Sequence, residues 1–584
     1  MIKENIYRNK TCAELRIENA GEVVRLAGWV DTIRKLGGIT FLTLRDHYGI
    51  TQVLVRDDKM LEGINKETVI SVLGTVIERE SKNPKMETGD IEIDCKEIRV
   101  LGKCNPVLPF EIDDAPNTKE ELRLKYRYLD LRNRALHDRI VKRAEILRFV
   151  RNKMSDMGFV EVQTPILTSS SPEGARDYIV PTILAPGEFY ALPQAPQQFK
   201  QLLMVSGFDK YFQIAPCFRN EAARADRTPG EFYQIDFEMS FATQEDVFAV
   251  VEDVAYSIYR EFTDFDIDKA PFVRIKYKDA METYCSDKPD LRNPLTVCDL
   301  TEFFKDVEFT PFNGKMIKGV KADCSSKSRK FYDEITTEIV KNEGKGSVWI
   351  KLGDEGLVGS LAKVLSPEKQ QELIEKVGLK HGESLVMVAD ENGKVQKLAN
   401  VLRTFLGENL GLVDKNKVIF CWIVDFPFYE KNEETGAVDF SHNPFSLPQG
   451  GLDALLHKNP FDIVAYQYDL VCNGYVCNGV ELSSGAVRNH DPELMVKAFE
   501  IAGYDRSVVE NKFPALFNAF SYGAPPHAGG ALGFDRMLMP IMKQEFIRDV
   551  IAFPMNKNGR DLLMNAPSEI DEKTLRELGI KVIK

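Results

Sequence analysis

The amino-acid sequence predicts a multidomain α+β protein with a small β-barrel, a core of strands and helices, and an α/β module inserted into that core. Three observations support this prediction. The chain has 584 residues, more than one hydrophobic core usually organises. Short strand-like segments with regularly placed glycines occupy residues 22–100, as is typical of a barrel. Strand-rich segments with candidate catalytic residues flank a central stretch that has none.

The composition is that of a folded protein and limits its partners. With 43% hydrophobic and 28% charged residues, the chain differs from disordered and collagen-like proteins. A formal charge of −13 argues against indiscriminate nucleic-acid binding, so a nucleic-acid partner must meet local basic patches. The N-terminus lacks a signal-peptide core, and no stretch approaches ~20 apolar residues. We therefore expect a cytoplasmic protein without a membrane partner.

The cysteines do not suggest a metal site. The ten cysteines include no C-x-x-C pair, and Cys472 and Cys477 are isolated from other Cys or His residues, which argues against zinc. We expect them to be mostly reduced and structural.

The predicted barrel covers residues 1–106. Within it, residues 24–30 and 39–46 alternate enough to have an inner and an outer face. Barrels of the OB type bind single strands by stacking bases on exposed aromatic rings beside Arg and Lys, although a structural or protein-binding barrel is an equally open interpretation. A connector with prolines and acids, followed by a charged helical run at 120–134, predicts a hinge at 107–135.

The inserted module divides the rest of the chain. A helix is expected over 140–157, ended by Gly158. Residues 295–407 contain Lys-rich helices and Gly-rich turns but no dense cluster of catalytic residue types, and strand-rich sequence resumes after them. The pattern predicts a first core part at 136–294, an insert at 295–407 and a second core part at 408–584.

An arginine-rich hairpin is the first candidate for chemistry. It comprises residues 218–227 and 231–238, and it ends in alternating carboxylates. Arg219 can neutralise a phosphate with paired N–H groups, and Phe232 can stack on a purine face. The alternative is a surface hairpin with salt bridges, which exposed Arg and Glu residues form commonly and with little energetic gain.

A glycine-rich segment, residues 524–536, is the second candidate. Its glycines permit close approach of the backbone to a ligand, and a strand running into a helix would set Arg536 beside that ligand. The sequence has neither a Walker-type phosphate loop nor a strand-anchored G-x-G-x-x-G. ATP, if used, is therefore held differently.

Together these two segments resemble the second and third motifs of the class II aminoacyl-tRNA synthetases. Residues 158–165 resemble the first motif, whose proline lies at the dimer interface. The match narrows to the bacterial-type aspartyl-tRNA synthetases of subclass IIb, and it covers essentially the whole chain. The segments that narrow it are residues 173–177, 189–194, 197–201, 286–292 and 547–554.

The resemblance implies both a fold and a reaction. The barrel is expected to be an OB-fold anticodon-binding domain, the core to contain the antiparallel sheet of class II synthetases, and the insert to be a GAD-type domain. Aspartate attacks the α-phosphate of ATP to give aspartyl-adenylate, and the 3′-terminal adenosine of tRNA(Asp) then takes the aspartyl group. The implied partners are tRNA(Asp), L-aspartate, ATP and a second copy of the chain, and DNA is not among them. Catalysis then rests on positioning and charge stabilisation.

The resemblance also assigns roles to individual residues. Arg219 and Arg536 are the expected catalytic cations. Arg488 and Lys200 are expected to grip the substrate side chain, which selects aspartate because a neutral amide leaves two cations poorly paired. The implied aspartate-binding set is Glu173, Gln197, Lys200, Arg219, Asp236, His442 and Arg488. The implied ATP-binding set is Arg219, Asn220, Glu221, Phe232, Glu481, Gly533, Phe534, Asp535 and Arg536.

A magnesium site is implied close to a tandem repeat. Glu481 with Ser484 matches the position of a ligand for Mg²⁺, a hard ion that keeps several waters. Asp469 is an uncertain ligand because five more residues separate it from Glu481 than the family pattern has. The repeat Val-Cys-Asn-Gly-Tyr-Val-Cys-Asn-Gly occupies 471–479. An odd insertion turns strand side chains to the opposite face, so a bulge or a looped-out segment must absorb it. We expect an outward loop.

In the barrel, the resemblance assigns anticodon reading to Arg34, Phe41 and Gln52. Phe41 is the expected stacking platform. A phenylalanine buried in the barrel core is the alternative interpretation for Phe41.

The sequence departs from the family pattern at a few positions, and three other functions are alternatives. Ala195 and Asn443 replace a serine and a histidine of many relatives, and a longer turn puts an ATP role of Thr228 in doubt. An asparaginyl-tRNA synthetase shares the motifs and the barrel, but Lys200, Arg488 and the insert favour aspartate. An aspartate–ammonia ligase-like enzyme would lack the barrel, and a catalytically retired tRNA-binding protein would lose the motif arginines. The sequence leaves open whether tRNA(Asn) is charged and what the insert does.

Overall fold

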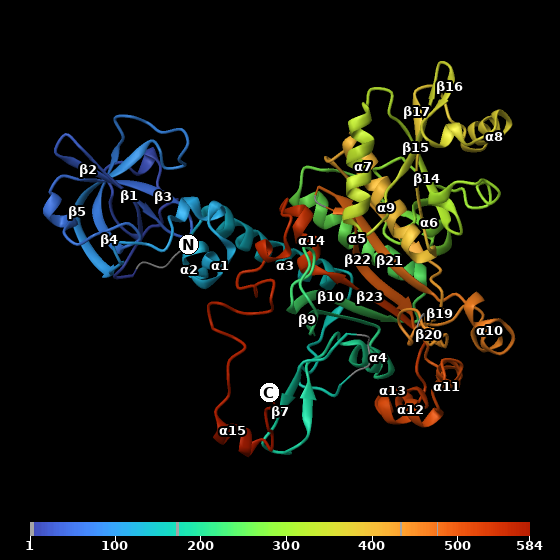
Figure 1. The fold of residues 1–584 in the computed structure, drawn as a ribbon. Helices are drawn as coiled ribbons and strands as arrows, with labels where there is room; N and C mark the ends of the chain where they lie inside the picture. Colours follow the sequence, from blue (N-terminus) through green and yellow to red (C-terminus); the bar gives the residue numbers. More distant parts are fainter. Residues whose placement is uncertain (1–4, 171–174, 433–434, 476, 584) are drawn as a thin grey trace. The chain divides into compact units, whose positions relative to one another are not determined.

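The structure, a computed structural model, describes residues 5–170, 175–432, 435–475 and 477–583. It divides into two compact units, residues 1–118 and residues 119–584 (Figure 1). The division falls inside the segment for which the sequence predicts a hinge. In the described ranges, none of the helices combines the length and the apolar character that a bilayer span requires.

Within the described residues, the first unit contains a closed barrel of five strands in the order β1-β2-β3-β5-β4. The strands are β1 (Val23–Leu36), β2 (Ile39–Arg45), β3 (Ile50–Val55), β4 (Val69–Glu78) and β5 (Ile91–Gly102). Because side chains alternate across each strand, Leu26, Leu42 and Val53 are fully buried in the barrel core. The OB-type barrel predicted from strand pattern and glycines is confirmed.

A helical connector leads into the second unit, and it is more broken than the sequence suggests. The predicted run at 120–134 consists of α1 (Glu120–Lys125) and α2 (Arg127–Asp130), after which α3 (Arg134–Asp156) begins. The Asn133 side chain caps α3 by accepting the Leu136 N–H at 3.4 Å, which explains why this helix starts earlier than predicted. It ends before Gly158, whose φ of +84° suits a helix terminus.

Within the described residues, a central sheet of nine strands organises the second unit. Its order is β11-β18-β21-β22-β23-β10-β9-β6, and β12 also pairs with β18. Most pairs are antiparallel; only β6 with β9, β11 with β18 and β12 with β18 are parallel. The strands are β6 (Val160–Glu161), β9 (Lys210–Arg219), β10 (Gly230–Ser240), β11 (Asp266–Ile267), β12 (Val273–Lys276), β18 (Lys417–Val424), β21 (Gln467–Gly474), β22 (Cys477–Val487) and β23 (His527–Gly533).

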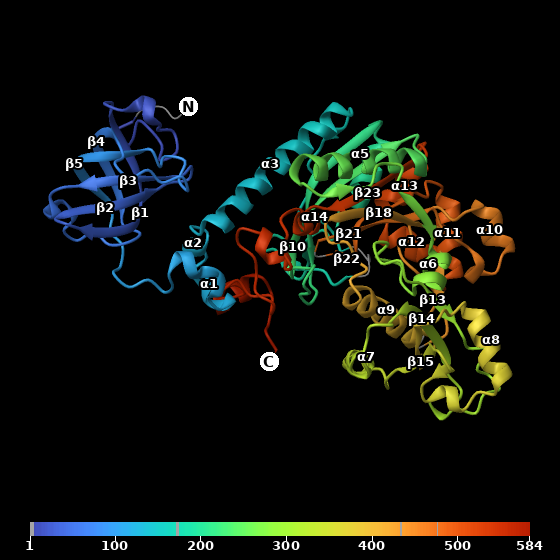
Figure 2. The same ribbon diagram turned by 90° about the horizontal axis from the view of Figure 1, so that it is seen from above.

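Helices cover both faces of this sheet (Figures 1 and 2). The helices α3, α5 (Gln244–Phe262) and α14 (Phe534–Ile541) pack on one face and form the main hydrophobic core, where Phe248 stacks on Trp422 with ring centres 4.1 Å apart. A separate apolar cluster joins the helices of the other side. These are α4 (Gln197–Val205), α11 (Pro492–Ile501), α12 (Arg506–Lys512) and α13 (Pro514–Phe520).

A second, smaller sheet lies in the stretch predicted to be an insert. Its strand order is β13-β14-β17-β15-β16. Its strands are β13 (Val297–Asp299), β14 (Met316–Asp323), β15 (Val348–Gly353), β16 (Gly356–Val358) and β17 (Glu383–Asp390). Helices α7 (Arg329–Lys341) and α9 (Asn392–Asn409) share one core with this sheet, and α8 (Pro367–Val377) contributes to another.

Shorter elements decorate the second unit. They are α6 (Tyr277–Tyr284), α10 (Gly451–His457), α15 (Glu572–Glu577), the hairpin β7 (Ile179–Pro181) with β8 (Phe189–Ala191), and the hairpin β19 (Tyr429–Lys431) with β20 (Val438–Phe440).

The tandem repeat is not an outward loop, so that prediction is wrong. Strands β21 and β22 pair across it as a hairpin that extends the central sheet. Their register shifts between Leu470 and Val471 and again between Cys472 and Asn473, and these bulges absorb the added residues. The Asn473 side chain, fully buried, accepts the Leu291 N–H at 2.8 Å. This long-range bond favours the paired strand over a loop.

Candidate active site

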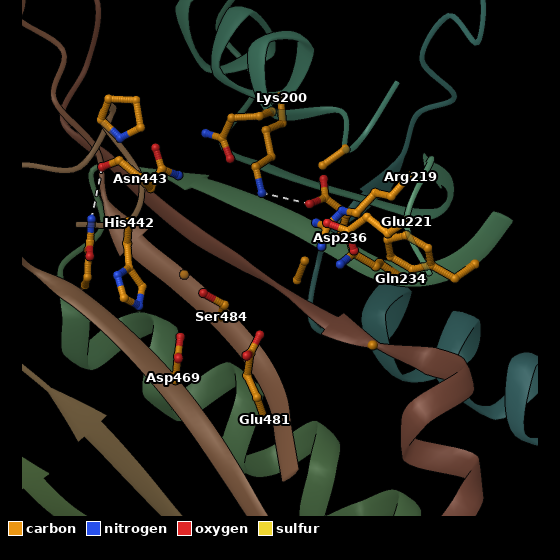
Figure 3. A pocket seen from close by; sticks show the side chains of 18 of the residues that line it. Lys200, Arg219, Glu221, Gln234, Asp236, His442, Asn443, Asp469, Glu481 and Ser484 are labelled. Atoms are coloured by element: carbon orange, nitrogen blue, oxygen red, sulfur yellow. Dashed lines mark hydrogen bonds and ion pairs between the residues drawn. The ribbon is translucent and has the colours of Figure 1, made fainter. Parts of the chain in front are cut away.

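A cavity of about 640 Å³ opens beside the central sheet. Strands β9, β10, β21, β22 and β23, the start of α14, and residues of α4, α11 and α12 line it. Figure 3 shows side chains from these elements converging on one space, with Lys200 and Asp236 in direct contact. The cavity has two chemically different ends and a third, acidic region.

One end of the cavity is built from buried opposite charges. The Lys200 ammonium donates to Asp236 Oδ1 at 2.7 Å and lies 3.4 Å from Glu238 Oε2. Arg488 donates through Nε and Nη2 to the two oxygens of Glu238 at 2.9 and 3.2 Å. All four side chains are at most 3% exposed. Burial raises the pKa of Asp236 despite the nearby Lys200, whereas Arg488 and Lys200 outweigh burial and lower the pKa of Glu238.

A second row of buried polar groups supports this end. Gln197 donates to the Gln201 side chain at 3.0 Å, and Gln201 lies 3.1 Å from His527 Nε2. The His527 Nδ1 lies 2.8 Å from the Pro525 carbonyl, which can only accept, so Nδ1 donates and Nε2 accepts. Burial lowers the pKa of His527, which favours its neutral form. His442 lies apart from this row; it is exposed and faces the cavity (Figure 3).

The other end of the cavity combines an aromatic ring with arginines. The Arg219 guanidinium lies over the Phe232 ring, 5.1 Å from its centre, because the two residues stand on the paired strands β9 and β10. Arg536, at the start of α14, donates to the Glu481 carbonyl at 2.7 Å and pairs with Asp226 at 3.3 Å. A flat purine and several phosphates find a stacking surface and cations here.

An acidic pair lies beside the arginine end. Asp469 on β21 and Ser484 on β22 are register partners, and Glu481 lies on the cavity side of β22 (Figure 3). Burial and the charge of Glu481 hold the pKa of Asp469 well above its ordinary value. Lys288 Nζ lies 3.4 Å from Glu481 Oε2, and the acidic neighbours raise the Lys288 pKa against the effect of burial. The oxygen donors of this region are of the kind that Mg²⁺ takes.

Comparison with known proteins identifies the family. Residues 119–557 match the model described as tRNA synthetases class II (D, K and N), and residues 24–101 match the OB-fold nucleic acid binding domain. The chain belongs to the class II tRNA synthetases. The mostly antiparallel sheet and its helices therefore belong to the core of a synthetase, and the barrel is its OB-fold nucleic acid binding domain.

Similar synthetases cover nearly the whole chain. The aspartate–tRNA ligase of Streptomyces avermitilis is 50% identical over 99% of this chain and 99% of its own. The aspartate–tRNA(Asp/Asn) ligase of Gluconobacter oxydans is 50% identical over 98% and 97%. The asparaginyl-tRNA synthetase of Pyrococcus horikoshii, solved with asparaginyl-adenylate, shares a TM-score of 0.56 at 20% identity over 95% of this chain and 98% of its own. At that identity the solved structure shows the fold alone.

The cavity of the synthetase brings together most residues that the sequence singles out. They are Gln197, Lys200, Arg219, Glu221, Phe232, Asp236, His442, Asp469, Glu481, Ser484, Arg488, Gly533, Asp535 and Arg536. Asn220 instead lines a small neighbouring depression with Arg176 and Arg224. The Phe534 side chain is fully buried in the core against Arg143 and does not line the cavity. Glu173, which is expected to bind aspartate, lies outside the residues that the structure describes.

Two residues that were not predicted from the sequence contact predicted site residues and orient them. Glu238 orients Arg488 with two hydrogen bonds, and its signal was the alternation of Asp236 and Glu238 on one face of a strand. Lys288 reaches Glu481 from a segment more than 190 residues earlier in the chain, and no local pattern relates the two.

The barrel presents Arg34, Phe41 and Gln52 on its outer face. Arg34 and Phe41 are partners across β1 and β2, and Gln52 on β3 is the partner of Thr43, two residues along from Phe41. Phe41 is half-buried and lies outside the barrel core cluster, contrary to the alternative of a core phenylalanine. Gln52 is 9% exposed and bonds Glu92 at 2.6 Å and Arg79 at 2.8 Å.

Proposed function

We propose that this synthetase is an aspartate–tRNA ligase. It activates L-aspartate with ATP and transfers the aspartyl group to the 3′-terminal adenosine of tRNA(Asp). The observation that carries this proposal is a pair of buried cations, Lys200 and Arg488, at one end of a cavity that holds Arg219 and Phe232 at the other. Relatives 50% identical over nearly their full length support the same reaction. Because the reaction serves protein synthesis, the cytoplasm is its proposed location.

The buried charges select aspartate. Glu238 fixes the Arg488 guanidinium, and Asp236 fixes the Lys200 ammonium. The substrate brings a carboxylate to the two cations and an ammonium to Asp236. The cluster of two cations and two carboxylates therefore stays balanced in a site that excludes water, where charges interact strongly. Asparagine brings the ammonium without the side-chain carboxylate, so it leaves an excess positive charge in the buried cluster. The substrate ammonium then lies near Asp236 and Gln197.

The other end positions ATP for in-line attack. Phe232 stacks on adenine, Arg219 neutralises the α-phosphate, and Arg536 holds the distal phosphates. The substrate α-carboxylate oxygen attacks the α-phosphorus, and the bond to pyrophosphate breaks. The 3′-terminal ribose hydroxyl of tRNA then attacks the activated carbonyl carbon, and AMP leaves. Both steps depend on orientation and fixed positive charge rather than on a nucleophilic side chain.

The acidic pair suits a magnesium ion. We propose that Asp469, Glu481 and Ser484 hold Mg²⁺. The geometry supports this fit: Asp469 and Ser484 are partners across β21 and β22, and Glu481 faces the same cavity. In the described residues no group of three or more His, Cys, Asp and Glu side chains is arranged for a metal, as suits an ion that keeps waters and phosphate oxygens as ligands. When bound, the ion neutralises the β- and γ-phosphates.

A second copy of the chain is the proposed partner at an apolar surface. Large apolar side chains beside the first motif and on the β7–β8 hairpin are exposed. Ile166 is 46% exposed, Leu167 52%, Ile179 62% and Leu184 88%. Exposed apolar groups of this kind mark association surfaces, and a two-fold dimer would bury the same surface on both copies.

Amino-acid-dependent exchange of pyrophosphate into ATP tests the activation step. We expect exchange with aspartate and not with asparagine. Arg488→Ala should lower the rate at least about 30-fold, because truncating one partner of a buried charge pair costs about 2–5 kcal/mol. Arg329→Ala, at an exposed arginine of α7, is the control and should match the wild type. Exchange with asparagine alone would refute the proposal.

Charging of purified tRNA(Asp) and tRNA(Asn) tests the second step. Relatives named aspartate–tRNA ligase and aspartate–tRNA(Asp/Asn) ligase are equally similar to this chain. Charging of tRNA(Asp) is required by the proposal. Charging of tRNA(Asn) as well would widen the acceptor range without changing the amino acid.

A further inference from the structure

The segment between α6 and β13, residues 286–292, brings a lysine to the acidic pair. Lys288 Nζ lies 3.4 Å from Glu481 Oε2 and donates to Asp287 Oδ2 at 3.2 Å. The Lys288 side chain is 35% exposed and Glu481 33%, so the contact lies at the edge of the cavity. The proposed role of Glu481 is to hold a metal ion, yet a fixed cation already lies against its carboxylate.

Other charges nearby do not replace this lysine. Arg536 donates to the backbone carbonyl of Glu481, but its guanidinium is paired with Asp226. The other charged neighbours, Asp287 and Asp469, are acidic. A divalent ion bound to Glu481 would therefore experience repulsion mainly from Lys288.

The tandem repeat holds the segment that carries Lys288. Asn473 accepts the Leu291 N–H at 2.8 Å and donates to the Pro289 carbonyl at 3.1 Å. Arg292 donates to the Gly474 carbonyl at 2.7 Å and to Asn478 at 3.2 Å. The contacts come from both copies of the Asn-Gly pair. Both halves of the repeat therefore hold residues 289–292 in place; we call this contact the clamp.

Gly479 allows the clamp to close. Its φ is +89°, and a Cβ added there would lie 1.9 Å from the Lys288 carbonyl oxygen. Only glycine permits both this conformation and this approach. The backbone of Lys288 itself is therefore pressed against the repeat.

The inserted module holds the same segment from the other side. Arg403 on α9, 1% exposed, donates to the carbonyls of Asp290 and Asn293 at 2.8 and 2.7 Å. The Asn293 side chain returns a bond to the Arg403 carbonyl at 2.9 Å. The segment is thus fixed between the repeat hairpin and the insert.

We propose that Lys288 is a built-in counter-cation of the Asp469–Glu481 pair. The repeat holds it in place, and its charge weakens metal binding in the absence of nucleotide. This inference rests on the proposed metal-binding role of Glu481. With ATP bound, the phosphates offer Lys288 a second anionic partner, so the ion and the nucleotide bind together more favourably than the ion alone. The repeat then has a function: by holding Lys288, it sets how strongly metal binding depends on bound ATP.

Binding of Mn²⁺ to the full-length protein without nucleotide tests this inference. Free Mn²⁺ is followed by electron paramagnetic resonance up to millimolar concentration. Lys288→Met, which keeps the apolar stem, should bind Mn²⁺ about tenfold more tightly than the wild type, since a unit charge roughly 5 Å from a divalent ion is removed. The gain should shrink at high salt. Lys288→Arg should match the wild type, and so should Lys278→Met, at a lysine of α6 that is 82% exposed.

Loosening the clamp gives a second measurement. Asn478→Ala removes the bond from Arg292 and the bond to Glu408 on α9. It leaves no buried cavity, since Asn478 is exposed. It should shift Mn²⁺ affinity in the same direction as Lys288→Met, by a smaller factor. Unchanged Mn²⁺ affinity in Lys288→Met, with weakened ATP binding, would overturn the inference and make Lys288 a phosphate ligand.

Glu481→Gln separates this inference from the proposed metal site. If Glu481→Gln abolishes Mn²⁺ binding but Lys288→Met binds like the wild type, only the counter-cation role is wrong. If Glu481→Gln binds Mn²⁺ like the wild type, or if no variant binds it, the proposed metal site itself is wrong.

Discussion

At the scale of single residues, the site depends on how buried charges are balanced. Lys200 and Arg488 are held in an almost dry environment by Asp236 and Glu238. Removing one partner of such a cluster leaves an uncompensated charge, which is costly where water is excluded. In the proposed function, Glu238 acts on the substrate through Arg488, whose guanidinium it orients with two hydrogen bonds.

Glu238→Gln keeps the side-chain volume but removes the charge that fixes Arg488. We expect the KM for aspartate in pyrophosphate exchange to rise at least about 30-fold, in line with costs of about 2–5 kcal/mol for disrupting a buried charge pair. The KM for ATP should change less than about twofold, because Arg219 and Phe232 are untouched. Glu245→Gln, at an exposed position of α5, is the control. Equal effects on both substrates would indicate general misfolding instead.

His527 predicts a pH dependence of stability. Burial lowers its pKa below the ordinary value of 6.5 in the folded protein, so the unfolded chain binds a proton that the folded chain does not. Its contribution is fully present above about pH 6.5 and is lost as the pH falls, by up to about 1.4 kcal/mol per pH unit. In His527→Gln, the drop in melting temperature between about pH 7.5 and pH 5.5 should be smaller than in the wild type. His457→Gln, at an exposed histidine, should retain the full drop.

At the scale of elements, local patterns predicted some features and failed on others. The strand running into a helix at the third motif is present as β23 and α14, because apolar periodicity and glycines mark it locally. The repeat at 471–479 carries two Asn-Gly turn signals, yet both pairs belong to strands. The bonds from Asn473 and Gly474 to residues 289–292 decide this pairing, and no window of sequence contains both partners. For the same reason Lys288 was not a candidate.

Gly479→Ala tests the bulge in that hairpin. A side chain at φ +89° costs about 1–3 kcal/mol, and here it would also collide with the Lys288 carbonyl. Gly503 has a similar φ of +84° but no atom within 4 Å of an added Cβ. The melting temperature of Gly479→Ala should therefore fall by several degrees more than that of Gly503→Ala. Equal melting temperatures would mean that the hairpin adapts and that the close approach is unimportant.

At the scale of the whole molecule, recognition and chemistry reside in different units. The net charge of −13 makes uniform attraction to tRNA weak, so affinity must come from local contacts. We propose that the outer face of the barrel supplies them, because exposed Arg34 lies beside half-buried Phe41 on paired strands. Stacking of a base on Phe41 depends on the area of the aromatic ring. Amino-acid activation does not involve the anticodon.

Phe41→Ala should therefore separate the two steps. Loss of one stacked base costs about 1–3 kcal/mol, so the KM for tRNA(Asp) in charging should rise between about 5-fold and 150-fold, while pyrophosphate exchange keeps its wild-type rate. Tyr48→Ala is the matched control, because Tyr48 is a 46% exposed barrel aromatic outside the strands that carry Phe41 and Gln52. A similar loss in both variants would assign the effect to barrel stability, and reduced exchange in Phe41→Ala would mean that the barrel supports the catalytic unit directly.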